Sequence, residues 1–278
     1  RDFPWRLRLS GGFITLALVC GSGLVGWGIE WLSRAAGPWG WPVLVIALAS
    51  ALAGRSLHGS VMTVLQALPA AATHEPTLAR QKLSWIVGRD VSQLDRAGIL
   101  RACAETASEN AVDGLFAPLF WMAVGCLLWC LNPAAPGPLA LAWMFKASST
   151  LDSMLGYRRG RLRWLGTAGA RLDDLLTWLP CRLVMLTLPL VSAPCNRWFG
   201  LVRAAERDGA PDPSPNAGRS EAIYAHCAGV RLGGRNRYGT TWVEKPLLAA
   251  DQPEPDRSAI QTILSLTIRL ELLWIVML

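Results

Sequence analysis

The stretch LSGGFITLALVCGSGLVGWGI, residues 9–29, contains no charged residue and decides the class of fold. A helix needs about 20 apolar residues to cross the ~30 Å hydrocarbon core of a bilayer. Residues 35–54 form a second uncharged stretch, and Glu30 and Arg34 lie in the short link between the two. The sequence therefore predicts a transmembrane hairpin over residues 1–54.

Further apolar segments follow within a core of residues 55–257 and at the C-terminal end. A proline-rich turn at 132–138 divides one uncharged run, because proline removes a backbone donor and fixes φ. Residues 175–193 contain Arg182 and prolines, so this segment either crosses the membrane or forms a re-entrant helix, which we favour. The predicted membrane segments lie near residues 114–131, 139–150, 175–193 and 258–278.

The composition supports the same class of fold. Hydrophobic residues make up 52% of the 278 residues, charged residues 17%, and the mean hydropathy is +0.30. These values exclude intrinsic disorder and argue against an ordinary cytosolic enzyme. We predict an all-α polytopic membrane protein with about four or five membrane segments. Its arginine-rich stretches 55–110, 146–174 and 195–257 are expected to form the site on the cytoplasmic face.

The net charge of +7 and the seven cysteines say little about specific partners. The basic residues flank apolar segments and the aromatic residues lie within them, so nucleic acid is not an expected partner. The cysteines are scattered, with no C-x-x-C pair and no nearby histidine cluster. Neither a disulfide framework nor a zinc site is predicted.

Glu105, Glu109 and Asp113 follow one another at four-residue spacing and would form one acidic stripe on a helix. Like charges at this spacing repel each other, so the stripe favours a bound cation. Mg²⁺ together with phosphate is a natural partner for one or two carboxylates. The alternatives are a solvated face or pairing with Arg101.

Three other stretches carry polar residues beside apolar segments. Lys146 and Asp152 follow one segment, and Arg171 with Asp173 precedes the next; Asp173 is either a metal ligand or base, or part of a local ion pair. The third stretch contains Arg231, Gly233 and Gly234. Glycines let backbone N–H groups approach a phosphate and arginine adds charge, although Arg231 could equally hold a carboxylate or a loop carbonyl.

Taken in order, these motifs resemble those of the adenosylcobinamide-phosphate synthase family (CbiB/CobD) of cobalamin biosynthesis. The resemblance covers about residues 55–250 and lacks the N-terminal Gly-Asp-Pro and His-Pro elements usual in that family. The motifs that carry it are SWIVGRD (84–90), ETASENAVDG (105–114), APLFW (117–121), KASSTLDSMLGY (146–157), ARLDD (170–174), SPNAG (214–218), GVRLGG (229–234) and VEKP (243–246).

The resemblance implies a multi-pass enzyme of the bacterial inner membrane whose site faces the cytoplasm. Such an enzyme joins the propionate of adenosylcobyric acid to aminopropanol, its O-phosphate or an ethanolamine analogue, with ATP and Mg²⁺ as expected cofactors. The expected catalytic residues are Glu105, Glu109, Asp113, Lys146, Asp152 and Asp173, with Glu109, Asp113 and Asp173 as metal ligands. The expected substrate-binding residues are Arg89, Asn110, Tyr157, Arg171, Ser214, Asn216, Arg231, Gly233, Gly234 and Lys245.

Two functions of another class stay open at this point. A relative that kept the fold could act as a membrane sensor or regulator, or it could bind a corrinoid as a scaffold without ligating it. The retention of every polar motif favours the enzyme. Beside the corrinoid, the amine, ATP and the bilayer, the expected partners are a second copy of the chain or other enzymes of the cobalamin pathway.

Overall fold

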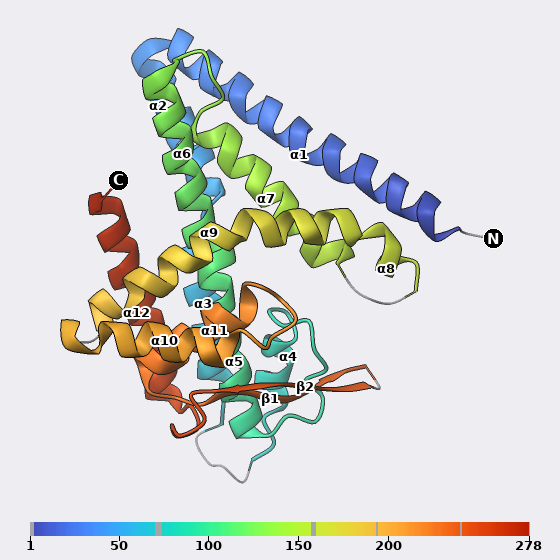
Figure 1. The fold of residues 1–278 in the computed structure, drawn as a ribbon, viewed down its shortest axis with the longest axis vertical. Helices are drawn as coiled ribbons and strands as arrows, with labels where there is room; N and C mark the ends of the chain where they lie inside the picture. The colour runs from blue at the N-terminus through green and yellow to red at the C-terminus, as the bar shows by residue number, and fades with distance from the viewer. Residues whose placement is uncertain (1–2, 70–73, 157–159, 193, 240, 278) are drawn as a thin grey trace. The chain divides into compact units, whose positions relative to one another are not determined.

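The computed structural model of the protein describes residues 3–69, 74–156, 160–192, 194–239 and 241–277. It is 74% helical and, within those residues, its only sheet has two strands (Figure 1). Four helices are long and apolar enough to cross a membrane, and a bent helix pair could supply a fifth crossing. The prediction of a mostly helical, polytopic membrane protein is confirmed, and the small sheet is an addition that the sequence did not suggest.

The chain folds into two compact units that interleave along the sequence. Unit 1 comprises Arg1–Ala53 and Asp113–Pro180, and unit 2 comprises Gly54–Val112 and Cys181–Leu278. Unit 1 contains α1 (Pro4–Ala35), α2 (Trp41–Ser50), α6 (Ala117–Leu131), α7 (Pro138–Leu155), α8 (Leu162–Leu165) and the first part of α9 (Thr167–Ser192).

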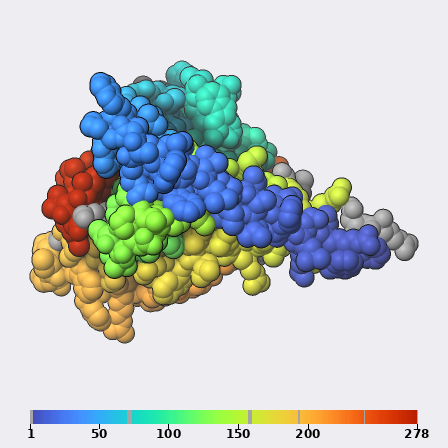
Figure 2. Space-filling view, turned by 90° about the horizontal axis from the view of Figure 1, so that it is seen from above, coloured from blue at the N-terminus to red at the C-terminus, as the bar shows by residue number. Residues whose placement is uncertain are grey.

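In unit 1, α1 packs against α7 through small residues (Figure 1). A Cβ added at Gly26 would lie 2.9 Å from the Ala140 Cα, and one added at Gly23 would lie 2.5 Å from the Met144 Cγ. Small residues let membrane helices approach closely. In lipid the hydrophobic effect does not drive helices together, so van der Waals contacts between the closely packed helices stabilise the pair. The other side of α1 exposes large apolar side chains such as Leu16 and Leu24, and Figure 2 shows much of α1, in blue, open on one face.

Glu30 joins the same two helices by hydrogen bonds. Its side chain is fully buried and accepts from the backbone N–H groups of Gly137 (2.8 Å), Leu139 (2.6 Å) and Ala140 (3.2 Å). These amides begin α7, where the first N–H groups have no partner within the helix. The sequence placed Glu30 in a loop between two membrane segments. The structure corrects this, because α1 continues to Ala35 and carries Glu30 into the packed interface.

We expect Gly26→Leu to lower the free energy of unfolding by about 1–3 kcal/mol or more, because the new side chain must push α1 away from α7. Thermal denaturation of the purified protein in detergent measures the effect. Gly28→Leu is the matched control, since a Cβ there meets no atom within 4 Å. Equal losses in both variants would contradict close packing at Gly26.

Unit 2 builds a second core around α5. The helices α3, α11 and α12 and strand β1 all pack against α5. Buried Ile99, Ile223 and Ile263 lie in this core, and the Tyr224 hydroxyl bonds Thr267 at 2.8 Å. Besides the second part of α9, unit 2 contains α3 (Gly54–Ala67), α4 (Thr77–Leu83), α5 (Arg96–Ala111), α10 (Trp198–Gly209), α11 (Ala217–Ala228), β1 (Leu232–Tyr238), β2 (Thr241–Leu248) and α12 (Arg257–Met277).

The helices differ in detail from the predicted membrane segments. A π-helical turn over Val112–Phe116 joins α5 to α6, so the candidate span is Arg96–Leu131 rather than 114–131. By length and composition, α7 is not among the four candidate spans, although it covers the predicted 139–150. Helix α9 runs through Pro180 and Pro189 without a break. Whether α9 crosses the bilayer or re-enters it stays a prediction.

Candidate functional site

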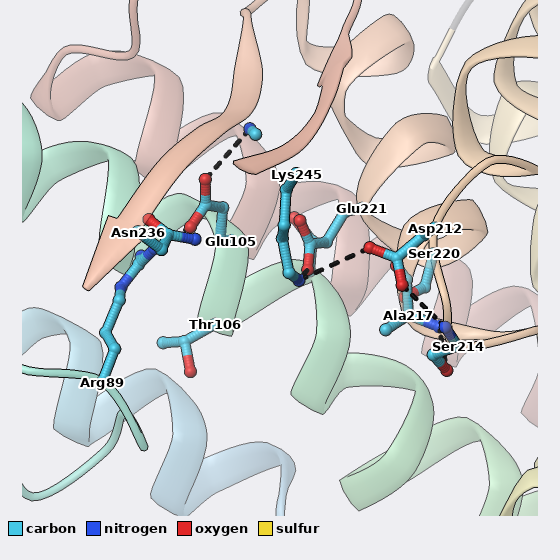
Figure 3. Close-up of polar contacts among 12 residues, drawn as sticks. Arg89, Glu105, Thr106, Asp212, Ser214, Ala217, Ser220, Glu221, Asn236 and Lys245 are labelled. Atoms are coloured by element: carbon cyan, nitrogen blue, oxygen red, sulfur yellow. Dashed lines mark hydrogen bonds and ion pairs between the residues drawn. The ribbon is translucent and has the colours of Figure 1, made fainter. Parts of the chain in front are cut away.

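Seven polar side chains gather inside unit 2, and we call them the polar cluster; Figure 3 labels each of them except Glu109. They come from α5, from the segment before it, from the turn before α11, from α11 and from the β1–β2 hairpin. Most of these side chains are buried, so each needs a partner of suitable charge or hydrogen-bonding capacity. The polar cluster consists of Arg89, Glu105, Glu109, Asp212, Glu221, Asn236 and Lys245.

One half of the polar cluster is centred on Glu105. Its carboxylate accepts from the Arg89 guanidinium at 2.5 Å, with both side chains only 7% exposed, and from the Gly233 backbone N–H at 3.0 Å. Arg101 lies one helical turn before Glu105, and its Nε is 3.8 Å from a Glu105 carboxylate oxygen. Arg89 also donates to the buried Asn236 side chain. The Glu105 carboxylate is therefore held in place from α5, the preceding segment and β1.

The contact of Gly233 with Glu105 depends on an unusual backbone. Gly233 has φ +81°, and the hairpin register is irregular between Gly233 and Gly234. A Cβ at Gly233 would lie 1.9 Å from the Pro246 carbonyl oxygen on β2. Only glycine adopts this conformation without strain, and the irregular register turns its N–H toward the carboxylate.

The other half of the polar cluster is centred on the Lys245 ammonium. Lys245 Nζ lies 3.2 Å from a Glu221 oxygen and 3.7 Å from an Asp212 oxygen, and the Glu109 charge also acts on it. These carboxylates raise the pKa of Lys245 and keep it charged, although burial alone would lower it. Burial, together with the charges of Glu105 and Glu109, raises the pKa of Glu221 well above its ordinary value.

A tight turn before α11 positions Asp212. The Asp212 carboxylate accepts from the Ser214 backbone N–H at 2.8 Å (Figure 3). The Ser214 hydroxyl in turn accepts from the N–H groups of Asn216 and Ala217, both at 3.2 Å. The Asn216 side chain accepts from Arg182 at 2.7 Å. Ser214 and Asn216, which the resemblance assigns to substrate binding, thus shape the turn that carries Asp212.

The structure brings five of the predicted residues into the polar cluster or its edge and leaves others nearby. Asn110 donates to the Thr106 carbonyl at 3.0 Å, one turn below the cluster. Gly234 faces the Arg101 guanidinium. Arg231 pairs at the surface with Glu254 at 2.9 Å, which is the alternative that its sequence context left open. The five predicted residues are Arg89, Glu105, Glu109, Gly233 and Lys245.

The remaining predicted residues belong to unit 1 or lie outside the described chain. Asp152, on α7, lies close enough to Asp174 to interact with its charge. Lys146 is half-buried on α7, and Arg171 is exposed on α9. The catalytic roles of these residues and of Asp113 and Asp173 stay predictions. Tyr157 lies outside the described residues.

The predicted magnesium site has no preformed protein cage. Among the described residues, no group of three or more His, Cys, Asp or Glu side chains is placed to hold a metal ion. In the polar cluster, the Lys245 ammonium already lies between the carboxylates of Glu221 and Asp212. These residues therefore do not fit a metal held by protein ligands alone.

Sequence reasoning missed Asp212, Glu221 and Asn236. A signal existed for Glu221, because it is followed in α11 by a run of buried residues from Ala222 to Ala225 and is itself 1% exposed. A charged residue on a helix face that is otherwise apolar needs a buried partner. Asp212 stands between two prolines just before the SPNAG motif, which also marks a fixed turn.

Comparison with known proteins agrees with these motifs. The model of one protein family, described as CobD/Cbib protein, matches residues 2–267. The cobalamin biosynthesis protein CobD of Synechocystis sp. is 44% identical over 242 residues, which cover 87% of this chain and 68% of the relative. CobD of Klebsiella pneumoniae is 43% identical, covering 86% and 71%, and CbiB of Salmonella typhimurium is 40% identical, covering 88% and 73%. No solved structure matches the chain. The chain belongs to the CobD/CbiB family of cobalamin biosynthesis proteins.

Proposed function

We propose that this protein is an adenosylcobinamide-phosphate synthase of the bacterial inner membrane. It forms an amide between the propionate of adenosylcobyric acid and aminopropanol or its O-phosphate, and it consumes ATP on the cytoplasmic side. Membership of a cobalamin biosynthesis family supports a biosynthetic enzyme. The observation that carries the proposal is the polar cluster, because it joins charged residues from three separate family motifs, and a backbone N–H from a fourth, inside a packed core.

The chemistry of amide formation accounts for such a mixture of charges. The propionate is most simply activated as an acyl phosphate, which forms when its oxygen takes the γ-phosphoryl group of ATP and ADP leaves. The ammonium form of the amine then loses a proton, the nitrogen lone pair forms the C–N bond, and the C–O bond breaks and releases phosphate. A second proton leaves the nitrogen as the amide forms. These steps need cations beside the phosphoryl oxygens and carboxylates that accept protons.

The two halves of the polar cluster could divide these tasks. Arg89 and Arg101 gather positive charge around Glu105, while Asp212 and Glu221 gather negative charge around Lys245. Groups fixed by packing need little reorganisation when charge develops, and this is where electrostatic catalysis gains most. Mg²⁺ enters the proposal as the counter-ion of ATP, since it usually keeps waters and binds through substrate phosphates with one or two carboxylates.

Incubation of the purified protein in lipid with adenosylcobyric acid, ATP, Mg²⁺ and each aminoalcohol tests the proposal. Mass spectrometry should show a corrinoid heavier by the amine minus one water, and only when ATP and amine are both present. Omission of ATP is the control. A protein that binds the corrinoid without forming product under any of these conditions would be a scaffold, and the proposed ligase activity would then be wrong.

A further inference from the structure

The polar cluster contains more carboxyl groups than cationic side chains. The described residues contribute three cations: Arg89 is 7% exposed, whereas Lys245 and Arg101 are 21% and 27% exposed. One carboxyl group is therefore left without a matching cation. The four carboxyl groups belong to Glu105, Glu109, Asp212 and Glu221, and the three cations to Arg89, Lys245 and Arg101.

Glu109 is the carboxylate that remains open. Glu105 accepts from Arg89 and a backbone N–H, while Asp212 and Glu221 share Lys245. Glu109 makes no hydrogen bond or ion pair with any described residue, although its charge interacts with those of Lys245, Asp212, Glu105 and Arg89. Glu109 is only half-buried, whereas Glu105 and Glu221 are buried. Glu109 is therefore the carboxyl group of the polar cluster that has no partner of its own among the described residues.

The polar cluster already accommodates a primary ammonium. The Lys245 ammonium lies against Glu221 and Asp212, and both carboxylates are fixed from outside the pair, Glu221 by α11 and Asp212 by the Ser214 turn. A second alkylammonium beside Glu109 would meet three carboxylates around one lysine. Phosphate would be repelled by the same charges, and the described residues offer no three-ligand metal site.

We propose that Glu109, backed by Asp212 and Glu221, binds the primary ammonium of the amine substrate. The identity of this amine as a substrate rests on the proposed function, but the binding of an alkylammonium does not. The site explains why the acceptor would be chosen by its amine rather than by its hydroxyl group. It also places a carboxylate where the ammonium must lose its first proton before attack.

Isothermal titration calorimetry of the purified protein, without ATP or corrinoid, tests the binding directly. The probes are 1-amino-2-propanol and 1,2-propanediol, which replaces the ammonium by a neutral hydroxyl. The wild-type protein should bind the amine at least about tenfold more tightly than the diol. Glu109→Gln should weaken amine binding by about ten- to a hundredfold and leave diol binding unchanged. Glu109→Asp, which keeps the charge, should retain most of the affinity.

Glu244→Gln is the matched control. It removes one negative charge, as Glu109→Gln does, but Glu244 is exposed on β2 next to Lys245. It should bind the amine as the wild type does. Amine binding by Glu109→Gln equal to that of the wild type would overturn the inference, and so would an equal loss in Glu244→Gln. If the wild type forms no product yet discriminates amine from diol through Glu109, the proposed function fails and the ammonium site stands.

Discussion

Gly233→Ala is expected to reduce the amide-forming activity by at least about a hundredfold. The added Cβ would lie 1.9 Å from the Pro246 carbonyl oxygen, and φ +81° is costly for any residue with a side chain. The hairpin must then shift, and Glu105 loses the N–H that accounts for one of its bonds. Removal of one donor from an oxyanion hole costs about 10²–10³ in rate, and we expect a loss of this order when Glu105 is displaced. Steady-state kinetics with the corrinoid substrate measure the loss.

Gly239→Ala separates this effect from a general sensitivity of the hairpin. Gly239 also has a positive φ, +60°, but a Cβ there meets no atom within 4 Å. The substitution should cost some stability and leave most of the activity. If Gly233→Ala is as active as Gly239→Ala, the contact between the hairpin and Glu105 has no part in the reaction.

Arg89→Ala should lower the free energy of unfolding by about 3–5 kcal/mol, because it leaves the Glu105 carboxylate buried without its main counter-charge. It also removes the partner of the Asn236 side chain. Chemical denaturation in mixed detergent micelles gives the free energy, and activity should fall with it. Arg237→Ala is the control: Arg237 pairs with Asp90 at 3.4 Å, both residues are more than 20% exposed, and such pairs contribute about 0–1 kcal/mol.

A double variant checks the physical reason for the Arg89 effect. Arg89→Ala combined with Glu105→Ala removes both members of the ion pair, so the Glu105 carboxylate is no longer buried without its main counter-charge. The double variant should be more stable than Arg89→Ala alone. If it is less stable by the sum of the two single losses, packing rather than charge dominates at this position.

The acidic stripe shows how far sequence reasoning reaches in this protein. Helical spacing predicted that Glu105 and Glu109 share a face, and the structure places both in the polar cluster on α5. The same spacing placed Asp113 with them, but Asp113 lies in the π-helical turn and belongs to the other compact unit. A change in helical period alters which residues share a face, and side-chain spacing alone does not reveal it.

The hairpin could not be predicted for a different reason. The first strand, residues 232–238, contains paired glycines and alternating arginines, so it lacks the β-branched run that marks a strand. The sequence suggested a phosphate-binding loop around Gly233 and Gly234. In the structure the N–H of Gly233 does bind an anion, but the anion is the Glu105 carboxylate. This partner lies 128 residues away in the sequence, so it could not be predicted without the tertiary fold.

The buried Glu30 has a consequence for how the protein is made. Released into lipid alone, α1 would expose a carboxyl group to hydrocarbon, and α7 would begin with amide groups that have no acceptor. The Glu30 carboxylate on α1 is the acceptor for these amide groups, and the amide groups are the donors that the buried carboxylate needs. We expect α1 to reach its stable position only after residues 137–140 have been synthesised and can pair with Glu30.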